Sequence, residues 1–308
     1  MLEGIVYRST GSWYSVKTEA GFYDCRIKGR IRLEGIKNTN PVAVGDRVHI
    51  QVDPNHPEQG VIQKILDRKN YIIRRSVNLS KQTHIIAANI DQVFLIVTLN
   101  NPVTTPTFID RFLVSAEAYS IPVVLLFNKV DSYTPEEKKA IAEMEAIYSG
   151  IGYETHRISA LASQGVTTVK TLMKGKVSMF SGHSGVGKST LANAIAPELD
   201  LKTAAISESH AQGQHTTTFA EMFDLESDIR IVDTPGIRGF GVVDMNSEEL
   251  SDYFPEFLKR QDQCKFNNCL HLQEPQCAIK KALEEGSISP TRYQSYLQLL
   301  EEDTPYRK

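Results

Sequence analysis

Residues 177–195 read VSMFSGHSGVGKSTLANAI, which is an apolar run, a glycine-rich turn and the start of a helical pattern. The turn, Gly182 to Ser189, matches G-x-x-x-x-G-K-S/T and stands between a predicted strand and a predicted helix, as that motif requires. Its glycines let successive backbone N–H groups surround phosphate oxygens, Lys188 reaches the phosphates, and the Ser189 hydroxyl ligates Mg²⁺. The stretch therefore predicts a nucleotide site in an α/β domain.

The sequence around this turn has the pattern of a doubly wound sheet. Apolar runs typical of parallel strands covered on both faces lie at residues 93–97, 123–127, 177–180 and 229–232. Between the first two runs, Ile109, Phe112, Leu113 and Ala116 recur at helical spacing. We therefore expect an α/β nucleotide-binding domain over residues 71–243.

A second motif, NKVD at Asn128–Asp131, indicates which base is bound. The Asp131 carboxylate can accept both the N1–H and the N2–H of guanine, whereas adenine offers an acceptor at N1 and no amine at C2. A site that hydrogen-bonds a substrate donor rejects the analogue lacking it by as much as ~10⁴-fold. Asn128 is expected to brace this loop and the Lys129 stem to cover the base. The motif therefore favours GTP over ATP.

Two further segments complete the predicted site. The sequence ISAL, residues 158–161, follows a short predicted strand and can offer the Ala160 N–H to guanine O6. The sequence DTPG, residues 233–236, follows another strand, so Asp233 can hold Mg²⁺ through water while the Gly236 N–H contacts the γ-phosphate. The motifs stand in the reverse of the usual order, because the base-reading loop precedes the phosphate loop by some fifty residues.

Residues 1–70 have a different pattern, with short runs of Val, Ile, Tyr and Arg separated by turn signals. This spacing predicts a small β-barrel of the OB-fold type, which binds RNA through aromatic and basic side chains. Up to Arg75 the chain has 13 Lys and Arg against 8 Asp and Glu, although its total charge is -3. An all-β domain with a merely solvated surface remains the alternative. The candidate RNA-binding residues are Trp13, Tyr14, Tyr23, Arg26, Lys28, Arg30 and Arg32.

Residues 244–308 are predicted to form a helical module with a metal site, the first helix beginning at Asn246 or Ser247 and another at Ser289-Pro290. Three of the four cysteines cluster here with one histidine, and in a reducing compartment this indicates a metal rather than disulfides. Three thiolates and one imidazole suit one structural zinc ion. Buried free cysteines are the alternative, and Cys25 is assigned to the barrel. The predicted zinc ligands are Cys264, Cys269, His271 and Cys277.

The order NKVD, SAL, GHSGVGKS, GQHTTT, DTPG, between a β-rich N-terminus and a Cys/His cluster, resembles the RsgA family. These are circularly permuted GTPases that assist assembly of the bacterial small ribosomal subunit. The resemblance spans essentially the whole chain. It implies GTP and GDP binding, contact with the small (30S) subunit and its rRNA, and hydrolysis stimulated by that subunit. No apolar run approaches the ~20 residues of a membrane span, so we expect a cytoplasmic protein. We also expect a monomer.

The switch segment GQHTTT, residues 213–218, carries the catalytic question. Thr217 is the expected Mg²⁺ and γ-phosphate contact, with Thr216 and Thr218 as alternatives. Many GTPases have a water-positioning Gln directly after D-x-x-G, but Ile237 stands there. His215 is the candidate catalytic group, as the resemblance also implies. The alternatives are that His215 is only a solvated residue of a loop, or that His183 has the catalytic role.

Three functions remain open from the sequence. The first is a GTPase triggered by the small subunit that leaves after a late maturation step, and the second is an RNA-assembly or checkpoint factor in which hydrolysis is incidental. A GTPase acting on another RNA or partner is the third. The predicted magnesium ligands are Ser189, Thr217 and Asp233. The predicted GTP-binding residues are Asn128, Lys129, Val130, Asp131, Ser159, Ala160, Gly182, His183, Ser184, Gly185, Val186, Gly187, Lys188, Ser189, Thr190, Thr217, Asp233 and Gly236.

Overall fold

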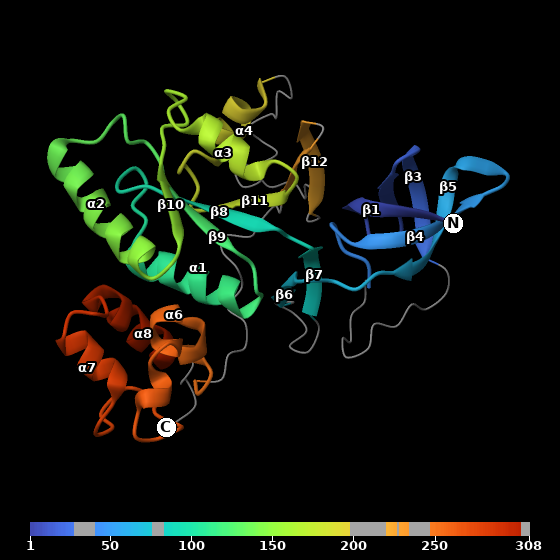
Figure 1. Cartoon of the computed structure of the whole chain (residues 1–308). Coiled ribbons are helices and arrows are strands. Elements are labelled where there is room, and N and C mark those ends of the chain that lie inside the picture. Colours follow the sequence, from blue (N-terminus) through green and yellow to red (C-terminus); the bar gives the residue numbers. More distant parts are fainter. Residues whose placement is uncertain (28–40, 76–82, 198–219, 227, 234–246, 303–308) are drawn as a thin grey trace.

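A computed structural model describes residues 1–27, 41–75, 83–197, 220–226, 228–233 and 247–302 of the chain. Its parts follow the sequence: a β-barrel at the N-terminus, a central α/β sheet and a helical module at the C-terminus (Figure 1). The barrel and the helical module lie at opposite sides of the central sheet. The three patterns seen in the sequence therefore correspond to three regions of the fold.

Five of the described strands close into the N-terminal barrel, as predicted. They are β1 (Leu2–Ser9), β2 (Tyr14–Thr18), β3 (Gly21–Ile27), β4 (Arg47–Asp53) and β5 (His56–Ile65). Neighbouring strands pair in the circular order β1-β2-β3-β5-β4, and β4 pairs with β1 to close the barrel. Alternate side chains fill the interior, among them Val16, Ile50 and Ile62. Cys25 belongs to this core, so its assignment to the barrel is confirmed.

The central sheet has the strand order β10-β9-β8-β11-β13-β12. Its strands are β8 (Gln92–Val97), β9 (Val123–Phe127), β10 (Glu154–Arg157), β11 (Val177–Ser181), β12 (Glu221–Glu226) and β13 (Ile229–Asp233). All adjacent pairs are parallel except β12 with β13, which are antiparallel. The four apolar runs were thus correctly predicted as strands, and the strand that leads into the phosphate loop lies at the middle of the sheet.

Helices cover both faces of this sheet. On one face lie α1 (Pro106–Ala118) and α2 (Pro135–Gly150), and on the other α3 (Val166–Met173) and α4 (Lys188–Ile195). Ile109, Phe112 and Leu113 of α1 are buried against β8 and β9, as the helical spacing predicted. Because side chains alternate along each strand, one strand serves two cores: Leu95 faces the first and Phe94 the second.

The barrel is attached to the edge of the sheet that β12 forms. Arg8 of β1 is the register partner of Glu221, and their side chains form an ion pair. The hydroxyl of Tyr7 donates to Asp224 Oδ1 at 2.7 Å, and Lys17 also pairs with Asp224. A two-stranded hairpin, β6 (Tyr71–Arg75) and β7 (Thr83–Ala88), lies between barrel and sheet (Figure 1). The barrel is therefore tied to the hairpin β12–β13, a contact that the sequence did not reveal.

The C-terminal module consists of short helices, η2 (Leu250–Tyr253), α6 (Pro255–Leu258), η3 (Gln261–Gln263), α7 (Ala278–Glu284) and α8 (Pro290–Glu302). The helix expected to begin at Asn246 or Ser247 was wrong: residues 247–249 form a turn, and a single 3₁₀ turn follows. Phe254 is extended because a residue before proline is disfavoured in the helical region, and α6 starts anew at Pro255. The helix predicted at Ser289-Pro290 is confirmed.

The module packs against α1 through a buried ionic network. Arg292 of α8 is 1% exposed and donates from Nη1 to Asp110 Oδ1 of α1 at 2.7 Å. The same guanidinium donates from Nε to Glu256 Oε1 of α6 at 2.7 Å. Tyr148 of α2 donates to Asp110 Oδ1 at 2.8 Å. Val114 of α1 joins the apolar core of the module, so one interface combines charge pairing with apolar burial.

Candidate functional site

The phosphate loop, residues 182–189, connects β11 to α4. At two of its glycines, a side chain would collide with neighbouring atoms unless those atoms moved. Gly182 has φ +135°, and a Cβ there would lie 2.5 Å from the Ile96 carbonyl oxygen. Gly187 has φ +103°, and a Cβ there would lie 2.5 Å from Asn128 Nδ2. The loop is therefore held against the neighbouring strand β8 and against NKVD, with the N-terminus of α4 behind it.

Asn128 directly follows β9 and joins the two loops that the sequence separates by some fifty residues. Its side chain is 2% exposed, and Nδ2 donates to the Val186 carbonyl oxygen of the phosphate loop at 2.8 Å. Its Oδ1 accepts the Ala160 N–H at 3.0 Å. The reordered motifs thus meet at the carboxyl edge of the sheet, and Asn128 braces the loop as expected.

Lys129 also spans the two loops. It has a left-handed φ of +65°, and Nζ donates to the Gly185 carbonyl oxygen at 2.9 Å and to the carbonyl of Asn101. Val130 is buried beneath the loop, while the Asp131 carboxylate is exposed. This arrangement leaves the group that would read guanine accessible while the residues before it are anchored.

The segment ISAL lies beside this loop, at the end of β10. Ser159 is buried, and its hydroxyl accepts the Ala162 N–H at 3.0 Å, which orders the turn. Because the Ala160 N–H donates to Asn128 in this structure, its predicted contact with guanine O6 requires that bond to be shared or exchanged. Its role toward guanine stays a prediction.

Lys188 illustrates the electrostatics of the phosphate site. Its ammonium donates to the carbonyl oxygens of Gly182 and His183, each at 2.8 Å. Burial lowers the pKa of Lys188, and the charge of Asp233 at the end of β13 acts in the opposite direction. Asp233 and Lys188 therefore face one site. Ser189 is 8% exposed at the first turn of α4, so a hydroxyl and a carboxylate, the oxygen ligands that Mg²⁺ prefers, border the phosphate position.

His183, the weaker candidate for catalysis, is held by α1. Its ring lies on that of Phe108 with 3.9 Å between centroids and an interplanar angle of 33°. Burial lowers the pKa of His183, and the nearby Lys188 charge lowers it further, so the imidazole is neutral near pH 7. The contact connects the phosphate loop with the helix on which the C-terminal module packs.

The predicted switch residues lie outside the part of the chain that the structure describes. His215, Thr217 with its alternatives Thr216 and Thr218, and Gly236 lie outside the described residues, as does Ile237. Lys28, Arg30 and Arg32 of the barrel also lie outside them. The predicted roles of these side chains therefore rest on the sequence alone.

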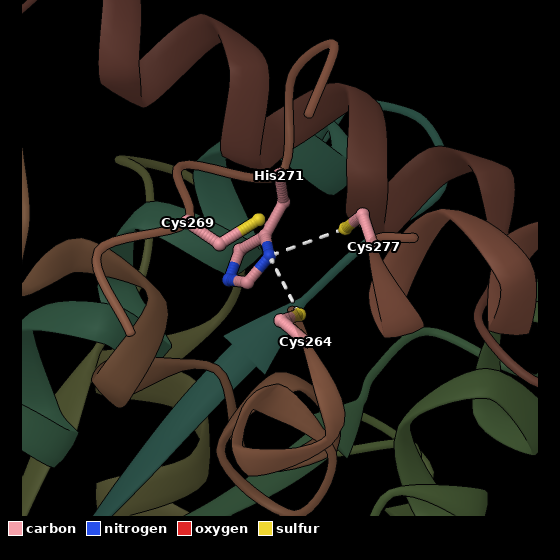
Figure 2. A group of neighbouring side chains, drawn as sticks. All are labelled: Cys264, Cys269, His271 and Cys277. Carbon is pink, nitrogen blue, oxygen red and sulfur yellow. Dashed lines mark hydrogen bonds between the residues drawn. The ribbon is translucent and has the colours of Figure 1, made fainter. Parts of the chain in front are cut away.

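Cys264, Cys269, His271 and Cys277 converge in the C-terminal module (Figure 2), as their sequence pattern predicted. Their ligand atoms all lie within 4.8 Å of one another, and His271 Nδ1 lies 3.7 Å from Cys264 Sγ and 3.4 Å from Cys277 Sγ. Zinc–sulfur bonds of about 2.3 Å in a tetrahedron place neighbouring ligand atoms about 3.5 to 4 Å apart. The cluster therefore has the dimensions to hold a metal ion.

The backbone around this cluster is fixed by groups outside it. Glu274 accepts the N–H groups of Leu270 and Leu272, at 2.9 and 2.7 Å. The hydroxyls of Tyr293 and Tyr296 on α8 donate to the carbonyls of His271 and Leu270, at 2.6 and 2.9 Å. These side chains support the turn that carries His271, which has a left-handed φ of +59°.

The protonation behaviour of the cluster also fits a cation. Burial raises the pKa of Cys269 to about 12 and also raises that of Cys277, because three thiolates side by side are unfavourable away from water. Burial lowers the pKa of His271, which keeps the imidazole neutral as a ligand must be. A bound divalent cation would reverse the thiol pKa shifts and deprotonate the cysteines.

Basic side chains lie over aromatic rings at two places on the described part of the barrel. Lys17 Nζ, which also pairs with Asp224, lies 5.4 Å from the ring centroid of Tyr7 and 5.7 Å from that of Phe22. The Arg26 guanidinium lies over the Trp13 ring, with 4.0 Å to the centroid. Several other basic residues of this region are paired with carboxylates, including Arg8, Arg47 and Arg68. The prediction that Tyr14 binds RNA was wrong, because its side chain is 1% exposed in the barrel core. Trp13 and Arg26 are the described members of the candidate RNA-binding set that have a stacking geometry suited to nucleic acid.

Sequence reasoning did not identify several residues that support these sites. Tyr133 and the segment 99–101 contact the NKVD loop, Phe108 contacts the phosphate loop, and Glu274 supports the metal cluster. Each of these residues acts through a tertiary contact. Among them, only the segment 99–101 has a local sequence signal, because Asn101-Pro102 indicates a turn after β8. Among the described residues, no helix combines the length and the apolarity that a membrane crossing requires.

Family models match most of the chain. Residues 3–62 match the model described as RsgA N-terminal domain, and residues 65–243 match RsgA GTPase. A protein of Christiangramia forsetii named small ribosomal subunit biogenesis GTPase RsgA is 63% identical over 99% of this chain and 98% of its own length. A protein of the same name from Flavobacterium johnsoniae is 60% identical, over 98% and 94% of the two chains.

Two solved structures share the fold along their whole length. The crystal structure of YjeQ from Thermotoga maritima has a TM-score of 0.80 and 35% identity, covering 99% of each chain. The crystal structure of YloQ, described as a circularly permuted GTPase, has a TM-score of 0.76 and 27% identity, covering 100% of this chain and 96% of that one. The reversed order of the motifs is thus shared with a solved structure.

Proposed function

Because the chain belongs to the RsgA family of GTPases, we propose that it binds the small ribosomal subunit, hydrolyses GTP there and is released after a late maturation step. The observation that best supports nucleotide binding is the contact between the reordered loops, in which Asn128 Nδ2 donates to the Val186 carbonyl oxygen of the phosphate loop. The proposed partner is supported by the names of the relatives, which specify the small ribosomal subunit. We further propose that the protein acts as a cytoplasmic monomer.

The described residues support distinct roles in this reaction. The phosphate loop and Lys188 would bind the phosphates, while Asp131 reads the base and Asn128 holds its loop in place. Ser189 and Asp233, together with Thr217, would hold Mg²⁺, which neutralises charge on the phosphates when bound. The main contribution of the protein is then positioning and electrostatic stabilisation, since phosphoryl transfer needs little covalent chemistry from side chains.

We divide these tasks among three domains. Residues 1–70 form the RNA-binding barrel, with Trp13 and Arg26 as contacts to rRNA, and residues 71–243 form the permuted GTPase domain. Residues 244–308 form the zinc module, in which Cys264, Cys269, His271 and Cys277 bind one structural Zn²⁺. The switch segments are followed directly by this module in the sequence, so a change at the γ-phosphate can reach it.

Co-sedimentation with separated ribosomal subunits tests the proposed partner. We expect the chain to pellet with small subunits in a non-hydrolysable GTP analogue and to stay in the supernatant in GDP. Large subunits serve as the control for general RNA binding. Equal binding to both subunits in both nucleotides would contradict the proposal and would instead favour a general RNA-binding protein.

His215→Ala tests the proposed catalytic residue. If a neutral imidazole orients or deprotonates the attacking water, subunit-stimulated turnover should fall about 100-fold while GTP affinity is retained. His156→Ala is the matched control, because it removes a histidine that pairs with Glu154 on the edge strand β10 and belongs to no nucleotide motif. Stimulated turnover that survives His215→Ala would remove the histidine from the mechanism.

Metal analysis tests the zinc module. We expect about one zinc per chain in protein purified without chelators, and a lower melting temperature after zinc is removed, because a small loop-rich module gains much of its folding free energy from the metal. Cys25→Ser is the control, because Cys25 lies in the barrel core, and this variant should keep the zinc content of the unaltered protein. A zinc content near zero in folded, active protein would show that the cysteines are ordinary buried thiols.

A further inference from the structure

Three consecutive residues after β8, Leu99 to Asn101, contact the segment that carries the base-reading loop, although no nucleotide motif includes them. Asn100 Nδ2 donates to Glu137 Oε1 at 2.6 Å. The other carboxylate oxygen of Glu137 accepts the Thr134 N–H at 2.8 Å and so closes the capping box at the start of α2. The segment is therefore joined to the beginning of α2.

Tyr133 makes the central contact of this group. Its hydroxyl accepts the Leu99 N–H at 3.0 Å and donates to the Asn128 carbonyl oxygen at 2.9 Å. The side chain is 4% exposed, and burial raises the pKa of Tyr133, so the hydroxyl retains the proton that it donates. A phenylalanine would occupy the space of the ring but would make neither bond.

The position of these bonds gives them their importance. Tyr133 follows Asp131 by two residues and bonds back to Asn128, so residues 128–133 form a closed loop with Asp131 inside it. Within this loop, the Ser132 N–H and hydroxyl both donate to the Lys129 carbonyl oxygen, at 3.0 and 2.8 Å. The direction of the exposed Asp131 carboxylate is therefore set by a turn that the Tyr133 hydroxyl holds shut.

We propose that Tyr133 is a positioning residue for guanine recognition, which acts by fixing the turn that aims the Asp131 carboxylate at the N1–H and N2–H of the base. The inference rests on the proposed guanine site. A carboxylate that accepts two hydrogen bonds at once must have a defined orientation, so a looser turn loses base selectivity before it loses phosphate binding. The phosphate loop keeps its own support from Asn128 Nδ2 and from the N-terminus of α4.

The test compares the affinities of Tyr133→Phe for GDP and IDP with those of the unaltered protein. Inosine lacks the exocyclic amine, so the unaltered protein should bind IDP about 10- to 100-fold more weakly than GDP, the value of one hydrogen bond to a charged group. We expect Tyr133→Phe to weaken GDP binding about tenfold and to reduce severalfold the ratio of the dissociation constant for IDP to that for GDP, called the IDP/GDP ratio below. A purely structural role would lower stability but would leave this ratio unchanged.

Tyr153→Phe is the matched control. Tyr153 is 9% exposed in the same core, and its hydroxyl donates to Glu117 at 2.9 Å, away from the loop. This variant should keep the GDP affinity and the IDP/GDP ratio of the unaltered protein. If Tyr133→Phe fails to fold, Asn100→Ala removes a neighbouring contact of the same segment and should shift the ratio in the same direction by a smaller factor.

The outcomes separate this proposal from the proposed site. A folded Tyr133→Phe protein with the unaltered IDP/GDP ratio would overturn the positioning role while leaving the guanine site intact. An unaltered protein that binds ADP as tightly as GDP would overturn the guanine site itself. A changed ratio in Tyr153→Phe as large as that in Tyr133→Phe would also contradict the proposal, because the effect would then be general to the core.

Discussion

Asp131→Asn is expected to weaken GTP and GDP binding by about 10⁴-fold and to turn the preference toward xanthine nucleotides. A carboxylate accepts from both N1–H and N2–H of guanine, but an amide offers one acceptor oxygen and one N–H₂ donor. Xanthine presents N1–H beside a carbonyl oxygen at C2, which matches that amide. The effect should be large because Asp131 is exposed on a loop that Asn128 anchors, and no other residue between 128 and 133 carries a carboxylate.

Equilibrium binding of GDP, XDP and ADP to Asp131→Asn measures this effect. Glu136→Gln is the matched control, since it removes an exposed carboxylate in the first turn of α2 and should leave all three affinities unchanged. A variant that binds GDP as tightly as the unaltered protein would refute the assignment of Asp131. Loss of all three nucleotides together would indicate a collapsed site rather than an altered base preference.

Arg292→Met is expected to destabilise the docking of the C-terminal module on α1 by about 3 to 5 kcal/mol. The substitution removes the one guanidinium that bonds to both Asp110 and Glu256, which are 0% and 3% exposed. Two buried carboxylates would then remain without their shared cation, and the side chains of Tyr148 and Ser295 hydrogen-bond to Asp110 only. Thermal and urea unfolding followed by fluorescence and by zinc release would show the loss.

Two further variants define what Arg292 contributes. Lys281→Met removes an exposed ion pair with Glu285, 3.8 Å apart, and should change stability by less than about 0.5 kcal/mol. Replacing Asp110, Glu256 and Arg292 together by apolar residues of similar size should recover much of the loss, because no unpaired charge would remain. If Arg292→Met were as stable as the unaltered protein, the ionic network would not join the module to α1.

The convergence of the nucleotide motifs and of the Cys/His cluster was predictable because the residues of each motif are close in sequence. The phosphate loop, the NKVD loop and the Cys/His cluster are each contained within a short segment whose spacing reflects the geometry of its ligand. Parallel strands place such loops at one edge of the sheet, so their convergence also followed. Asn128 was correctly predicted to brace the phosphate loop for this reason.

The supporting residues could not be predicted because their partners are distant in sequence. Arg292 meets Asp110, a residue 182 positions earlier, and Tyr7 meets Asp224, a residue 217 positions later. Nothing in the local pattern distinguishes such side chains from solvated ones. The wrong helix at Ser247 has a different cause, since its cap and acidic first turn were favourable but the proline at 255 interrupted the segment.

The attachment of the barrel suggests a second place to look for coupling between nucleotide state and partner. The switch segment DTPG precedes the C-terminal module in the sequence, and we expected coupling there. In the structure β12, which follows the GQHTTT segment in sequence, also carries Glu221 and Asp224, the residues that bind the barrel. The barrel and the C-terminal module are therefore each joined to an element that stands next to the predicted switch segments in the sequence.

Multiple-turnover GTP hydrolysis, measured with the purified chain alone, with small ribosomal subunits and with large subunits, tests the central claim most directly. We predict slow turnover by the chain alone, a rise of at least tenfold with small subunits only, and loss of that rise in Lys188→Ala, which lacks the phosphate-binding ammonium. Turnover that small subunits leave unchanged, in protein that nevertheless co-sediments with them, would contradict a subunit-activated GTPase. That result would identify a nucleotide-gated assembly factor in which hydrolysis is incidental.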